Sequence, residues 1–129
     1  MEMNGRVTVL RIALLVCALT PTAFVTATTP VSIRVSPAVS FAPANLVVQT
    51  VIEPDADNRA VEIVADAADF YRSSTVQLEG DRAPRTIRFE FRSLPPGEYR
   101  VSASVIGADG RSRAIGRTHV RVIESGLSR

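Results

Sequence analysis

The chain has 129 residues, which is room for one domain of ordinary size, and its formal net charge is only +2. All fifteen basic residues are arginines, and thirteen acidic residues nearly balance them, so the clustered basic excess of a nucleic-acid-binding protein is missing. A single cysteine excludes a disulfide framework and a thiolate metal site.

Residues 1–27 have the three parts of a secretory signal peptide. Arg6 and Arg11 supply the positive charge, and residues 12–19 form the apolar segment. Because a helix of this length rises only about 12 Å against roughly 30 Å for a bilayer core, we expect no stable membrane span after cleavage. Small residues at positions 25–27 predict cleavage after Ala27, with export to the periplasm or the exterior.

Cys17 lies inside the apolar segment, where it is removed with the signal peptide or, alternatively, lipidated. Lipidation is favoured by a small residue directly before the cysteine, whereas Val16 stands there. We therefore expect removal without a lipid anchor.

The rest of the chain shows the two-residue apolar period of β-strands with one buried face. A first strand covers residues 31–35, is interrupted by Pro37, and resumes at 39–41. Further strands are predicted at 46–52 and 61–65, separated by a polar loop.

The second half continues the same pattern after an irregular stretch at 67–74 and a short strand at 76–78. The clearest strand is 87–91, in which apolar residues alternate with charged ones; strands at 99–105 and 118–122 flank a turn at Asp109–Gly110. These seven strands predict an all-β fold, a seven-stranded antiparallel two-sheet β-sandwich over residues 28–123, with 124–129 as a C-terminal tail.

Residues 94–101, Leu-Pro-Pro-Gly-Glu-Tyr-Arg-Val, resemble the corner between two strands in fibronectin type III and related immunoglobulin-like modules, including bacterial ones. The resemblance implies an immunoglobulin-like sandwich. It also implies structural roles for Leu94, Gly97 and Tyr99, with the Tyr99 hydroxyl bonded to a backbone group a few residues upstream. It implies no catalytic residue.

No catalytic or cofactor site is predicted. His119, the single histidine, alternates with Val120 and Val122 and should face solvent. The loop after the second strand carries a candidate calcium-binding set, although these residue types are also ordinary loop formers: Glu53, Asp55, Asp57 and Asn58. We expect no metal and no other cofactor.

Outward arginines form the other candidate site. Arg88 and Arg92 share one face of their strand, and Arg100, Arg117 and Arg121 are expected on another. Such faces could bind anionic sugars or phosphates. The favoured interpretation is that they form ion pairs with neighbouring acidic side chains (Glu62, Asp66, Glu90, Glu98).

These observations predict an exported, non-enzymatic β-sandwich module with a protein-interaction, structural or adhesive role at the cell envelope or outside. Its expected partner is a protein or an envelope component, not nucleic acid. The alternatives are a glycan- or anion-binding module that uses the outward arginines and, less favoured, a small metal-dependent hydrolase.

Overall fold

The computed structural model describes residues 31–126 and is almost entirely β-structure, which confirms the all-β fold expected from the sequence. The predicted signal peptide, with Cys17, lies outside the described residues. The strands are β1 (Ser32–Ser36), β2 (Val39–Phe41), β3 (Ala44–Val51), β4 (Asn58–Ala67), β5 (Phe70–Gln77), β6 (Thr86–Leu94), β7 (Gly97–Gly107) and β8 (Ser112–Ile123), with a short 3-10 turn η1 (Gly80–Arg82). In this part of the chain, no helix is long and apolar enough to cross a bilayer.

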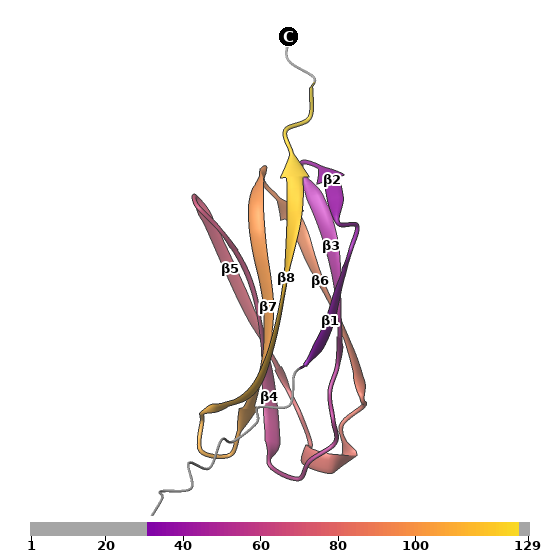
Figure 1. Cartoon of the computed structure of the whole chain (residues 1–129), viewed down its shortest axis with the longest axis vertical. Helices are drawn as coiled ribbons and strands as arrows, with labels where there is room; N and C mark the ends of the chain where they lie inside the picture. The colour runs from indigo at the N-terminus through magenta and orange to yellow at the C-terminus, as the bar shows by residue number, and fades with distance from the viewer. Residues whose placement is uncertain (1–30, 127–129) are drawn as a thin grey trace, which may run out of the picture.

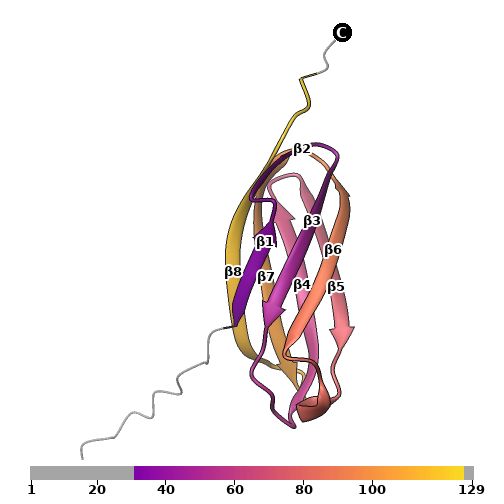
Figure 2. The same cartoon turned by 90° about the vertical axis from the view of Figure 1, so that its right-hand side faces the viewer.

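Two sheets pack face to face along the long axis of the molecule (Figures 1 and 2). One sheet has three strands in the order β1-β3-β6, and the other has five in the order β2-β8-β7-β4-β5. All neighbours are antiparallel except β2 and β8, which run parallel. This is the two-layer arrangement that strands with one apolar face require.

The predicted count of seven strands is wrong, because the first predicted strand is two strands in different sheets. β1 pairs with β3, whereas β2 pairs with β8 on the opposite layer. Pro37 lies between them and has no N–H to donate, so the ladder of β1 ends there and the chain crosses to the other sheet.

The prediction for residues 67–78 is also wrong in its boundaries. β5 runs without a break from Phe70 to Gln77. Two of its four inward positions are polar, because Arg72 and Ser74 stand in register with the buried Ala65 and Ile63 of β4. An edge strand tolerates such residues at its rim, and the apolar period that marks a buried strand is then lost.

The core lies between the sheets and draws on both. Leu46, Val48 and Phe91 come from the three-stranded sheet, and Ile63 and Val101 come from the five-stranded sheet; all are at most 1% exposed. Tyr99 is also fully buried, and its hydroxyl donates a hydrogen bond of 2.6 Å to the carbonyl oxygen of Pro95. This bond ties the start of β7 to the corner that precedes it, in the geometry of a tyrosine corner.

Candidate functional site

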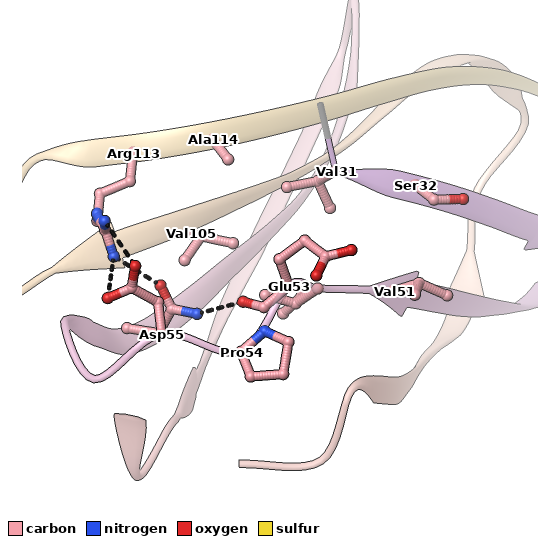
Figure 3. A pocket seen from close by; sticks show the side chains of 11 residues that line it. Val31, Ser32, Val51, Glu53, Pro54, Asp55, Val105, Arg113 and Ala114 are labelled. Carbon is pink, nitrogen blue, oxygen red and sulfur yellow. Dashed lines mark hydrogen bonds and ion pairs between the residues drawn. The ribbon is translucent and has the colours of Figure 1, made fainter. Parts of the chain in front are cut away.

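A pocket of about 350 Å³ opens at the end of the sandwich opposite the tyrosine corner (Figure 3). It lies where the loop between β3 and β4 meets the beginnings of β1 and β8. The lining combines apolar and polar side chains: Val31, Ser32, Val51, Ile52, Glu53, Pro54, Asp55, Asn58, Val105, Arg113 and Ala114. The volume is in the range of small-molecule sites.

Arg113 of β8 forms the polar wall of this pocket, as Figure 3 shows. Its Nη1 lies 3.0 Å from Asp55 Oδ1 and donates to Asn58 Oδ1 at 3.0 Å. Its Nη2 donates to Asp55 Oδ2 at 3.1 Å, and its Nε lies 3.3 Å from Asp57 Oδ2. One guanidinium on β8 therefore holds two carboxylates of the β3–β4 loop and the first side chain of β4.

The acidic partners are held by the backbone as well. Asp55 Oδ1 accepts a 2.8 Å hydrogen bond from the Asp57 amide, and Asp57 Oδ1 accepts one of 3.2 Å from the Ala108 amide. The Arg113 hydrogen bond, followed by that of the Asp57 amide, lowers the pKa of Asp55 below its usual value. The same Asp55 contact raises the pKa of Arg113. Both groups are thus charged at neutral pH, and their hydrogen-bonding capacity is largely used.

Glu53 is the carboxylate with the weakest partner at the rim. It pairs with Arg85 at 3.3 Å, but the two side chains are 71% and 64% exposed, so water screens this pair. Its backbone carbonyl is engaged by Asn58 Nδ2 at 2.9 Å, which fixes the loop and leaves the carboxylate at the pocket mouth.

Three members of the candidate calcium-binding set are brought together, but around an arginine. Asp55, Asp57 and Asn58 direct their side-chain oxygens to Arg113. Across residues 31–126, no three His, Cys, Asp or Glu side chains are grouped in a way that could hold a metal ion. Sequence reasoning missed Arg113 because its contacts span 55 and 58 positions. The sequence gives one indication of its position. Arg113 follows the predicted Asp109–Gly110 turn, after which β8 runs antiparallel to β7.

The candidate ligand-binding arginines lie on two separate faces, as the alternation of their strands suggested. Arg88 and Arg92 lie on the outer side of the three-stranded sheet, whereas Arg100 and Arg121 lie on the outer side of the five-stranded sheet. The whole thickness of the sandwich separates the two sets. Two of these arginines are paired, Arg92 with Glu90 at 3.5 Å and Arg121 with Glu98 at 2.6 Å.

His119 is exposed and stands opposite Arg100 on the outer face of the five-stranded sheet. It is not among the residues that line the pocket. No histidine therefore serves the pocket as a base.

No protein-family model and no curated protein sequence matches the chain. Solved structures do resemble it. A superoxide reductase (neelaredoxin) from Ignicoccus hospitalis is 14% identical, with a TM-score of 0.59 over 74% of this chain and 82% of that one. A family 76 glycoside hydrolase from a bovine Bacteroides thetaiotaomicron strain is 16% identical, with a TM-score of 0.55 over 77% of this chain and 21% of that one.

These likenesses show a shared fold and correct the function expected from the sequence. The expected non-enzymatic interaction, structural or adhesive module is contradicted, because the similar sandwich belongs to superoxide reductases. A single β-sandwich domain is therefore not sufficient ground to infer a non-enzymatic role. At 14% identity the likeness transfers no activity to this chain, so function has to be argued from the pocket.

Proposed function

We propose that this domain binds a small organic cation with an apolar body in the pocket at the Arg113 end of the sandwich. The observation that carries the proposal is the composition of the lining. Five aliphatic side chains surround the hollow, and its charged groups do not balance: Val31, Val51, Ile52, Val105 and Ala114 against Glu53, Asp55 and Arg113.

The apolar residues supply the affinity for the body of the ligand. Val31, Ile52 and Val105 belong to the buried core, so the pocket floor is continuous with the interior. Removing apolar ligand surface from water against such a floor is favourable by about 25 cal/mol per Å². Val51, which is 40% exposed, gains a partner when a ligand covers it.

The charges select the sign of the ligand. Arg113 already contacts Asp55, Asp57 and Asn58, so little of its charge is available to an anion. Glu53 has only the solvent-exposed Arg85 as a partner, and a ligand ammonium group can replace that arginine. With two carboxylates and one guanidinium in the lining, a cation is favoured at the mouth.

The proposal is limited to binding. Ser32 is the one hydroxyl-bearing side chain of the lining, and neither histidine nor cysteine accompanies it. A serine–histidine or cysteine–histidine pair is therefore absent from the pocket wall.

Isothermal titration with three probes of nearly the same shape tests the proposal: benzylamine, benzyl alcohol and benzoate. Benzylamine, a cation at neutral pH, should bind about fivefold more tightly than benzyl alcohol, because an added ion pair at a partly exposed site is worth about 1 kcal/mol. Benzoate should bind most weakly, because Arg113 is already satisfied.

Glu53→Gln should reduce benzylamine binding to the level of benzyl alcohol. The matched control is Glu62→Gln, which removes the same charge from the outer face of β4, and it should leave binding unchanged. Equal or tighter binding of benzoate, or failure of all three probes to bind the folded protein, would refute the proposal.

A further inference from the structure

The three-stranded sheet ends in a long unpaired strand. β6 is hydrogen-bonded to β3 on one side only, and it runs for nine residues along the flank of the sandwich (Figure 2). The backbone groups on its free side are a template for another strand.

An aromatic side chain beside this edge is incompletely covered. Phe91 is 1% exposed, whereas Phe89, two residues earlier on the same face, is only half-buried. The two rings pack edge to face with centroids 4.9 Å apart. A strand added beside β6 would extend the core over the exposed part of Phe89.

The outer face of β6 alternates in charge, with Arg88, Glu90 and Arg92 at successive outward positions. Across the sheet, Arg88 stands opposite Gln49 and Glu90 opposite Val47, so neither has a charged neighbour on β3. Among the described residues, Arg88 has no ion-pair partner.

We propose that β6 pairs antiparallel with β6 of a second copy of this chain, with the two-fold axis at Phe89. In this register each Phe89 faces its counterpart, and each Glu90 faces Arg88 of the other copy. Two opposite-charge pairs thus form symmetrically, as a two-fold interface requires. The two sheets of three strands become one continuous sheet of six.

Neighbouring registers are less favourable. A two-fold axis at Glu90 places the two Glu90 side chains opposite each other and Arg88 opposite Arg92, which sets like charges together. An axis at Phe91 also pairs Glu90 with Arg92, but it places Arg92 beside the centre, where its carbonyl oxygen already accepts a 2.6 Å hydrogen bond from Arg72 Nη1 of β5. An axis at Phe89 places Arg92 at the end of the paired segment, opposite Thr86. The charge pattern and this contact therefore select Phe89.

Sedimentation equilibrium of the purified protein over a range of concentrations tests this pairing. The wild type should form a dimer, and Glu90→Arg and Arg88→Glu should each raise the dimer dissociation constant by on the order of tenfold or more, because each variant sets like charges opposite each other. The double variant Arg88→Glu/Glu90→Arg restores both pairs with exchanged signs and should dimerise like the wild type.

Glu62→Arg, on the outer face of the other sheet, changes the net charge as much as Glu90→Arg and should leave the dimer intact. Thermal unfolding of each variant shows whether it is folded, and the exchange leaves the uncharged neighbours Val47 and Gln49 in place. A wild type that stays monomeric at every concentration overturns the proposal. So does a folded double variant that fails to dimerise while the wild type does.

Discussion

At the scale of single residues, Tyr99 stabilises the fold both by the packing of its buried ring and by a hydrogen bond to the backbone. Its ring is fully buried, and its hydroxyl donates to Pro95. Tyr99→Phe keeps the ring and removes the bond, so the free energy of unfolding should fall by about 1–2 kcal/mol. Chemical denaturation monitored by circular dichroism measures this change. Tyr71→Phe is the control. Because Tyr71 is 61% exposed, removing its hydroxyl should have no measurable effect on the free energy of unfolding.

Tyr99 also predicts a response to alkaline pH. Burial raises the pKa of Tyr99 above its ordinary value of 10.0, and the Arg72 guanidinium opposes this shift. The folded state therefore keeps the phenol proton when the unfolded state releases it, so stability should decline as the pH rises from 10 through the pKa of the folded state. Tyr99→Phe should weaken this decline. If the stability of this variant depended on pH as that of the wild type does, the prediction would be contradicted.

Residue patterns in the sequence predict contacts that are close along the chain and miss those that are distant. The Tyr99 bond spans four positions and follows from the Pro-Pro-Gly corner. The loop carboxylates were found by type, but their chemistry depends on Arg113, which lies more than 50 positions away on β8. The acidic loop could therefore be considered only as a weak candidate for calcium, and the sequence did not reveal that an arginine occupies its centre in the fold.

At the scale of elements, β1 and β8 approach closely at Gly116. A Cβ atom built on Gly116 would lie 2.3 Å from the backbone oxygen of Val31 and 3.1 Å from Ile33 Cγ2. Gly116→Ala therefore has to displace β1 and should destabilise the fold by about 1–3 kcal/mol, the usual cost of overpacking. Urea unfolding tests this, with Gly126→Ala as control because nothing lies within 4 Å of that position. A neutral Gly116→Ala would show that β1 moves away freely.

The central strands of the five-stranded sheet were predictable, whereas its edge strand β5 was not. β6 is also an edge strand, but its apolar and charged residues alternate regularly, so the sequence predicted it clearly. β4 and β7 carry mainly apolar residues at their inward positions because they lie in the middle of the five-stranded sheet, with the buried Asn58 at the start of β4 as an exception. β5 is an edge with Arg72 and Ser74 facing inward, so its apolar period is broken although its backbone is regular. The first predicted strand is divided between two sheets because β2 pairs with β8. This pairing partner is distant in the sequence, so the local pattern of residues 31–41 does not reveal it.

At the scale of the whole molecule, both sheets contribute to one core, so the domain should unfold as a unit. Phe91 represents the three-stranded sheet in this core and is 1% exposed, whereas Phe89 beside it is half-buried. Phe91→Ala should therefore cost about 3–5 kcal/mol and Phe89→Ala clearly less. The chain has no tryptophan, so the buried Tyr99 contributes a fluorescence signal from the opposite sheet.

The measurement compares this tyrosine fluorescence with far-ultraviolet circular dichroism during denaturation of Phe91→Ala. Because the substitution lies in one sheet and Tyr99 in the other, coincident transitions at a lower midpoint are expected if the layers form one cooperative unit. Separate transitions would mean that the three-stranded layer unfolds alone. The Arg113 pocket would then lose Val31, Val51 and Ile52 from its wall before the rest of the fold is lost.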